Sequence, residues 1–164
     1  MDKILILAGG YSNEREISLI TARSVTRELK KIKKYKLLTI EPNGNFIKKL
    51  RIFKPKLVLN LLHGRYGEDG YIQSILESEK VKYTHSGVLS SSLAIDKEIS
   101  KKIFIQNKIL TPKYIKFIHD KNKKNIIKKI ENKLKFPVVI KPINEGSSVH
   151  VYICNKKNIL KNLK

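Results

Sequence analysis

Short apolar runs alternate with helical patterns through the first ~90 residues, and this alternation restricts the fold more than any other feature. Two parallel strands cannot be joined by a tight turn and need a crossover, which is usually a helix. The order strand, helix, strand therefore predicts an α/β fold, in which a parallel sheet has helices on its faces. Ser12 and Asn13 are the candidate N-caps of the first helix. The expected strands are 3–8, 35–40, 56–62 and, together with its exit loop, 81–87, and the expected helices are 16–32, 46–53 and 71–79.

The pattern changes after residue 87. A single long helix is expected over 88–109, and Thr111 and Pro112 end it because the residue before a proline avoids the helical conformation. This second part holds few apolar residues for a core of its own, so we expect further chain to follow Lys164. A strand is expected over 113–118 and a helix over 121–133. Two further strands, 136–142 and 149–154, are expected to form a hairpin, and a last helix begins after them.

The chain is strongly basic, with 35 lysine and arginine residues against 14 acidic ones and a formal charge of +21. Such a charge is typical of proteins that bind nucleic acid or anionic membranes. Almost all of the excess is lysine, mixed with isoleucine and asparagine as AT-rich coding DNA would produce, and it is not gathered with aromatic residues. We therefore expect a solvated basic surface, with no specific nucleic-acid partner and no membrane partner.

Cys154 is the only cysteine, which excludes a disulfide framework and fits a reducing cytoplasm. No window holds the roughly 18 apolar residues that a membrane-spanning helix needs. The N-terminal apolar run follows Asp2 and Lys3 and is too short for a signal peptide. These features predict a cytoplasmic protein.

Three loops with glycine and polar residues follow the expected strands: "AGGYSNERE" at 8–16, "HGRYGEDG" at 63–70 and "THSG" at 84–87. Open parallel sheets bind ligands beyond the carboxyl ends of their strands. Taken alone, the first loop fits an anion-attracting helix N-terminus and equally a tight turn whose acids match the helix dipole. The second loop has three glycines and four ionisable side chains, more than a turn requires, so it predicts a loop that contacts a ligand.

The segment 138–151, "VVIKPINEGSSVHV", places a lysine at the end of an apolar strand and a Gly-Ser-Ser turn after it. The lysine supplies charge and the turn supplies N–H and hydroxyl donors, which together suit a flexible cover over phosphates. The segment is not a P-loop, because the GxxxxGK[ST] pattern is absent.

These motifs resemble, in order and spacing, the N-terminal half of the D-alanine–D-alanine ligases. The resemblance implies a Rossmann-like, substrate-binding domain over 1–95 and the start of an α+β ATP-grasp central domain over 96–164, truncated at its C-terminus. The "HGRYGEDG" block is highly specific to this family, whereas the lysine strand and glycine hairpin are shared more widely among ATP-grasp ligases. The matching blocks are "LAGGYSNEREISL", "LLHGRYGEDGYIQSILE", "YTHSGVLSSSLAIDK" and "FPVVIKPINEGSSV".

Carried over position by position, the resemblance implies catalytic roles for three residues. Glu14 would hold the ammonium group of the first D-alanine, a task that needs a fixed carboxylate. Ser147 would hydrogen-bond with that acid. His63 would lie near the reacting carboxyl and phosphate, where a donor stabilises developing negative charge.

The nucleotide-binding roles implied by the resemblance fall on Lys97, Lys141, Glu145, Gly146 and Ser148. The two lysines would reach the phosphates of ATP, and the other three lie in the hairpin that covers the nucleotide. The family also uses Mg²⁺ or Mn²⁺, whose acidic and asparagine ligands come from its C-terminal half. We therefore expect no metal ligand within this chain.

The implied reaction is the ATP-dependent joining of two D-alanine molecules through D-alanyl phosphate, for peptidoglycan synthesis, by a full-length homodimer. The 164-residue chain alone is not expected to turn over. Two alternatives stay open. One is a sister ligase that makes D-alanyl-D-lactate or D-alanyl-D-serine, and the other is a non-catalytic remnant that binds D-alanine or nucleotide.

His85 and His150 stand where the family usually has glycine. A histidine at such a place is more often structural than functional. At His150 the alternative is that the larger side chain changes the mobility of the turn that covers the phosphates.

Overall fold

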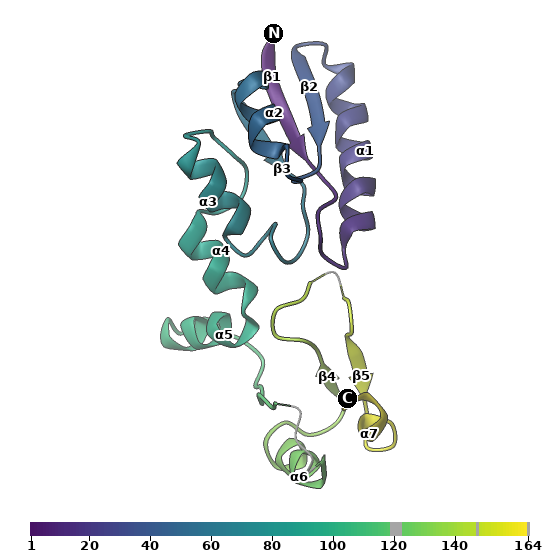
Figure 1. Ribbon diagram of the computed structural model, residues 1–164. Coiled ribbons are helices and arrows are strands. Elements are labelled where there is room, and N and C mark those ends of the chain that lie inside the picture. Colours follow the sequence, from purple (N-terminus) through teal and green to yellow (C-terminus); the bar gives the residue numbers. More distant parts are fainter. Residues whose placement is uncertain (119–122, 147, 164) are drawn as a thin grey trace. The chain divides into compact units, whose positions relative to one another are not determined.

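The computed structural model describes residues 1–118, 123–146 and 148–163, and the chain divides into two compact units, Met1–Ile95 and Asp96–Lys164. A three-stranded parallel sheet in the order β2-β1-β3 forms the centre of the first unit (Figure 1). The expected α/β fold with a parallel sheet is confirmed. The strands are β1 (Asp2–Leu7), β2 (Tyr35–Ile40) and β3 (Leu57–Asn60).

Residues 81–87, expected as a fourth strand and its exit loop, pair with β3 but do not form a regular strand. This segment contributes a single parallel bridge, between Tyr83 and Val58 of β3. Residues in the left-handed conformation bound it on both sides, Lys80 with φ +54° and His85 with φ +90°. Since an extended strand cannot pass through such residues, only a short stretch remains for pairing.

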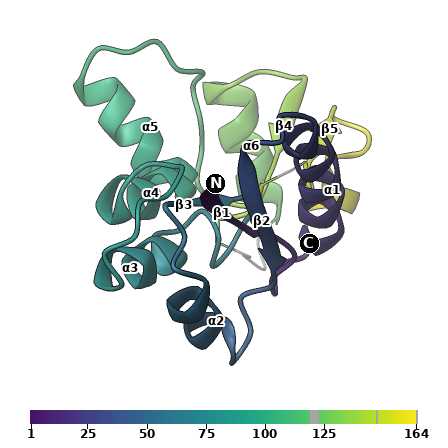
Figure 2. The same cartoon turned by 90° about the horizontal axis from the view of Figure 1, so that it is seen from above.

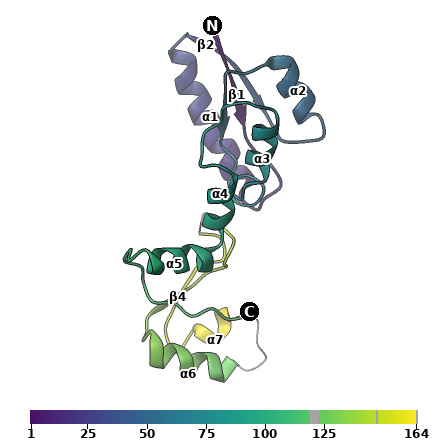
Figure 3. The ribbon, with the colours of Figure 1, turned by 90° about the vertical axis from the view of Figure 1, so that its left-hand side faces the viewer.

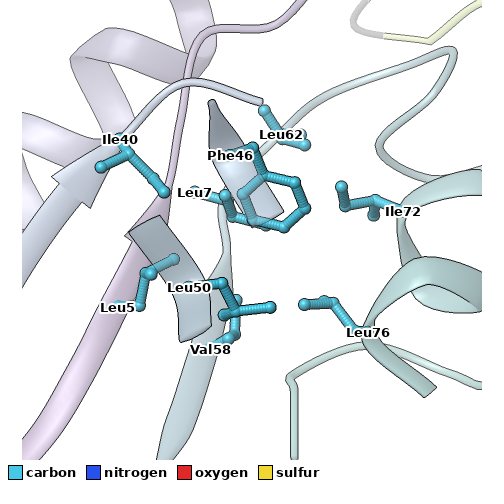
Figure 4. Close-up of a cluster of buried hydrophobic side chains, with 9 residues drawn as sticks. All are labelled: Leu5, Leu7, Ile40, Phe46, Leu50, Val58, Leu62, Ile72 and Leu76. Carbon is cyan, nitrogen blue, oxygen red and sulfur yellow. The ribbon is translucent and has the colours of Figure 1, made fainter. Parts of the chain in front are cut away.

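The two faces of β1 are covered by different helices of the first unit, as alternation along a strand requires. Leu5 and Leu7 pack with residues of α2 and α3 (Figure 4), whereas Ile4 and Ile6 pack with Ala22 of α1. Figure 2 shows α1 on one side of the strands and α2 and α3 on the other. The helices of this unit are α1 (Arg15–Lys31), α2 (Phe46–Phe53), α3 (Tyr71–Ser78) and α4 (Val88–Ile95).

Neither Ser12 nor Asn13 is the N-cap of α1, so this prediction is wrong. The cap is Glu14, whose side chain makes no capping hydrogen bond. The Ser12 hydroxyl instead accepts the Glu14 N–H at 3.1 Å and donates to the carbonyl of His63 at 2.7 Å. The serine is therefore used to hold two loops together, and the helix begins after it.

The single helix expected over 88–109 is also wrong, because the chain forms α4 and then α5 (Lys97–Gln106). Asp96 separates them with an extended backbone, φ −83° and ψ 107°. Its carboxylate accepts the N–H groups of Glu98 at 2.8 Å and Ile99 at 2.9 Å, which makes it the N-cap of a new helix.

The second unit also contains α6 (Lys123–Lys133), β4 (Val138–Ile140), β5 (Tyr152–Cys154) and α7 (Ile159–Asn162). β4 and β5 form the expected antiparallel hairpin. The expected strand over 113–118 is wrong, because this segment is irregular and pairs with no strand among the described residues. Residues 121–122, expected as the start of the helix, lie outside the described residues.

A small core does close in the second unit, where α6 and α7 pack against one face of the hairpin (Figure 3). Its buried residues are Ile126, Ile130, Cys154, Ile159 and Leu163. On the opposite face, Val139 and Ile153 form a cross-strand pair and are 55% and 76% exposed. In both units together, no helix of the described residues is long and apolar enough to cross a bilayer.

Tyr83 gives a pH-dependent prediction for the first unit. It donates its phenolic hydrogen to Glu77 Oε1 at 2.6 Å, and burial, reinforced by this bond, raises the pKa of Tyr83 to about 12 from 10.0. A raised pKa means that the stabilisation is complete below pH 10 and is lost as the pH rises through about 12. Alkaline titration of tyrosinate absorbance should therefore show a late step that Tyr83→Phe removes.

As a matched control, Tyr11→Phe removes a tyrosine that is 71% exposed and should leave the late step in place. Loss of that step in Tyr11→Phe, or its persistence in Tyr83→Phe, would contradict the assignment.

Candidate functional site

Glu14 is a buried acid at the start of α1, with only 4% of its surface exposed. Its carboxylate lies against Gly64, the second residue of the "HGRYGEDG" loop. A Cβ atom built on Gly64 would be 2.6 Å from Glu14 Oε1, and the backbone there has φ +67°. Glycine at this position therefore lets the two loops meet, as their place at the carboxyl ends of β1 and β3 predicts.

His63 lies between α1 and its own loop. Its Nε2 is 3.4 Å from Thr21 Oγ1, and its Nδ1 is 3.9 Å from Glu68 Oε1. The other oxygen of Glu68 accepts the N–H of Gly64 at 2.7 Å. Glu68 thus fixes the loop backbone and presents a carboxylate to the imidazole.

Ion pairs in and near the first loop distinguish Glu14 from the neighbouring acids. Arg15 donates to both oxygens of Glu41, at 3.1 Å and 2.7 Å, and this hydrogen bonding lowers the pKa of Glu41. Glu16 contacts the same guanidinium at 3.0 Å. Arginine therefore pairs with the two outer acids, and Glu14 is the acid that reaches the interior.

Two buried amides hold the "HGRYGEDG" loop from beneath, and neither is among the residues predicted from the sequence. Asn60 and Gln73, each fully buried, donate to the carbonyl oxygen of Gly67 at 2.8 Å and 2.9 Å. Asn60 Oδ1 accepts the N–H of Leu62 at 3.2 Å. A polar residue inside the apolar run "KLVLNLL" was the available signal for Asn60, since a buried amide needs partners.

The amide of Asn60 also determines the proton position on His85. Because its oxygen accepts from Leu62, its nitrogen is the donor, and it lies 3.1 Å from His85 Nδ1. Nδ1 is therefore the acceptor, and the ring proton is on Nε2.

His85 and His150, for which the resemblance implied glycine, both have a left-handed backbone, with φ +90° at His85 and φ +54° at His150. Glycine adopts this conformation without cost, whereas another residue loses about 1–2 kcal/mol. His150 Nδ1 lies 2.9 Å from Glu145 Oε2, so each histidine has a side-chain partner at its strained position.

In the second unit, Lys97 is the first residue of α5 and ties that helix to the hairpin turn. Its Nζ donates to the carbonyl of Ile143 at 3.1 Å and to that of Glu145. Gly146 and Ser148 lie in the same turn, where their carbonyls accept N–H groups of the following residues. Ser147 lies outside the described residues.

Lys141 is exposed at the end of β4. Burial, and to a smaller extent the charge of Lys141, lowers the pKa of Lys101. Lys101 donates to Thr111 Oγ1 at 2.9 Å. This part of the second unit is therefore strongly cationic, a character that suits an anionic ligand.

The structure describes two sets of predicted site residues, each within one unit: Glu14 with His63, and Lys97 with Glu145, Gly146 and Ser148. Among residues 1–118, 123–146 and 148–163, no three His, Cys, Asp or Glu side chains are grouped closely enough to hold a metal ion.

A parallel sheet with glycine loops at its carboxyl edge, followed by a lysine-bearing hairpin, defines an α/β protein. Residues 103–163 match the family model described as "D-ala D-ala ligase C-terminus". The D-alanine–D-alanine ligase of Pelagibacter ubique is 68% identical over 162 residues, which cover 99% of this chain and 53% of that protein.

The solved structures agree with the sequence matches. The D-alanine–D-alanine ligase of Bacillus anthracis has a TM-score of 0.79 at 34% identity, covering 99% of this chain and 53% of that one. The same enzyme complexed with ATP has a TM-score of 0.76. The chain spans about half the length of the curated relatives it matches. Its resemblance to the N-terminal half of the D-alanine–D-alanine ligases is confirmed.

Proposed function

We propose that the natural gene product is an ATP-dependent D-alanine–D-alanine ligase that makes D-alanyl-D-alanine for peptidoglycan synthesis in the cytoplasm. The observation that carries the proposal is the buried carboxylate of Glu14 against the glycine of the "HGRYGEDG" loop. A fixed carboxylate beside a small-residue loop suits the ammonium group of a small amino acid. The sequence similarity to proteins named D-alanine–D-alanine ligase supports the same substrate.

Within this proposal, residues 1–95 form a Rossmann-like substrate domain and residues 96–164 part of an ATP-grasp domain. Glu14 holds the ammonium of the first D-alanine, and Ser147, which lies outside the described residues, has the catalytic role that the resemblance implies. His63 stabilises negative charge near the reacting carboxyl group. Its contacts with Thr21 and Glu68 hold the imidazole in place for this role.

Lys97 and Lys141 bind ATP phosphates in this proposal, and Glu145, Gly146 and Ser148 belong to the turn that covers the nucleotide. The bonds from Lys97 to the carbonyls of Ile143 and Glu145 support this role, because they keep the ammonium group at the turn. Mg²⁺ neutralises phosphate charge in such transfers. We assign its ligands to the part of the relatives that this chain does not span, and the active protein to a homodimer.

The proposed reaction has two steps. A carboxylate oxygen of the first D-alanine attacks the γ-phosphorus of ATP, which breaks the bond to ADP and gives D-alanyl phosphate. The amine of a second D-alanine then attacks the acyl carbon, and inorganic phosphate leaves. In both steps the residues of this chain act by positioning and by charge.

The test is phosphate release from ATP by the natural gene product with D-alanine, with L-alanine, or with D-alanine plus D-lactate. We expect release that requires D-alanine and is absent with L-alanine. Extra release with D-lactate would assign the protein to the sister ligases. A folded product that releases no phosphate with any of these substrates would refute the proposal.

A further inference from the structure

A groove of about 460 Å³ runs along α1 on the side of β2, within the first unit. It is lined by Arg23, Arg27 and Lys30, which share one face of α1 because they are four and three residues apart. Figure 1 shows α1 lying along β2. The chain has only five arginines, and two of them line this one groove.

The cations of the groove are incompletely neutralised. Arg27 donates its Nε–H to Glu28 at 3.1 Å, and Glu28 also accepts from Lys31 at 2.7 Å. Arg23 forms no hydrogen bond or ion pair in the part of the chain that the structure describes. Glu28 is therefore the carboxylate that partly neutralises the lining cations, and the groove keeps a net positive charge.

The remaining lining combines hydroxyl groups with an apolar floor. Thr26 of α1 and Thr39 of the edge strand β2 supply the hydroxyls, and Leu19 with the buried Ala22 forms the floor. Guanidinium forks and hydroxyls are the donors that bind phosphate oxygens best.

From this juxtaposition we infer that the α1–β2 groove binds a small molecule carrying two or more linked phosphate groups. The distance spanned by Arg23, Arg27 and Lys30 favours a ligand with several linked phosphates over a single phosphate. Lys30 is seven positions after Arg23, and a helix rises about 10 Å over that distance. A single orthophosphate reaches one neighbouring pair of cations, whereas linked phosphates contact all three.

The experiment uses the isotopically labelled natural gene product and inorganic tripolyphosphate as the probe. We expect saturable shifts of the Thr26 and Thr39 amide resonances, and weaker shifts with orthophosphate at equal concentration. The double variant Arg23→Gln with Arg27→Gln should weaken tripolyphosphate binding at these resonances about tenfold, since it removes two charge-assisted contacts.

The matched control is Lys48→Gln with Lys49→Gln, which removes the same charge from exposed positions on α2. We expect it to leave the affinity within about twofold, since exposed charges at a distance are screened. Equal weakening in both double variants, or the absence of shifts at Thr26 and Thr39, would overturn the inference. The measurement needs no D-alanine and no turnover, so its outcome is separate from that of the proposed ligase activity.

Discussion

Replacing Glu14 with glutamine in the natural gene product is expected to lower kcat/KM for D-alanine about a hundredfold, because the amide has no negative charge to form an ion pair with the substrate ammonium. Glu14 is 4% exposed, so an ammonium held there has little water to replace the lost partner. The loss should appear mainly in the apparent affinity for the first D-alanine, while the KM for ATP stays nearly unchanged. Steady-state phosphate release with varied D-alanine and then varied ATP measures both quantities.

Glu16→Gln is the matched control for this prediction. It makes the same chemical change two residues away, on a side chain that is 74% exposed and contacts Arg15. We expect its kcat/KM to stay within about twofold, because exposed ion pairs contribute little. Equal losses in the two variants would mean that Glu14 acts through the general charge of the loop, and the proposed role would be wrong.

Gly67→Ala is expected to destabilise the first unit by about 2 kcal/mol, the usual cost of forcing a methyl group into a packed site. A Cβ atom at this position would overlap the side chain of Leu62 and lie 3.1 Å from its carbonyl carbon. Relief requires the loop to move, and this movement would strain the bonds from Asn60 and Gln73 to the Gly67 carbonyl. Urea unfolding followed by circular dichroism measures the difference.

Gly44→Ala provides the comparison, because no heavy atom lies within 4 Å of a Cβ built there. Its free energy of unfolding should stay within about 0.5 kcal/mol of the wild type. If Gly67→Ala is as stable as Gly44→Ala, the loop is not held as the structure describes, and the support that Asn60 gives to the candidate site is lost.

Elements with strong local signals were predictable from the sequence. β2 and α2 have the expected bounds, 35–40 and 46–53, because a run of apolar residues bounded by turn residues determines each of them. β1 and α1 differ from expectation by a residue. That the two glycine loops lie at the carboxyl edge of the sheet also followed from the sequence, since parallel strands end at the same edge.

The wrong predictions share a cause. A local sequence pattern does not show which other residues will hydrogen-bond or pack with the segment. Residues 88–109 have a helical pattern throughout, yet Asp96 caps a new helix. Residues 113–118 look like a strand, but no described strand lies beside them, and Ile115 and Phe117 pack on the second core from irregular backbone.

By itself, the sequence determined the α/β class, the positions of the two glycine loops and the resemblance to ligases, because these depend on residue order and local spacing. Only the tertiary structure decided that Glu14 is buried against Gly64, that Asn60 and Gln73 hold the loop, and that α1 and β2 enclose a cationic groove. These features join residues far apart in the chain. Their energies depend on burial and on partners that packing alone brings together.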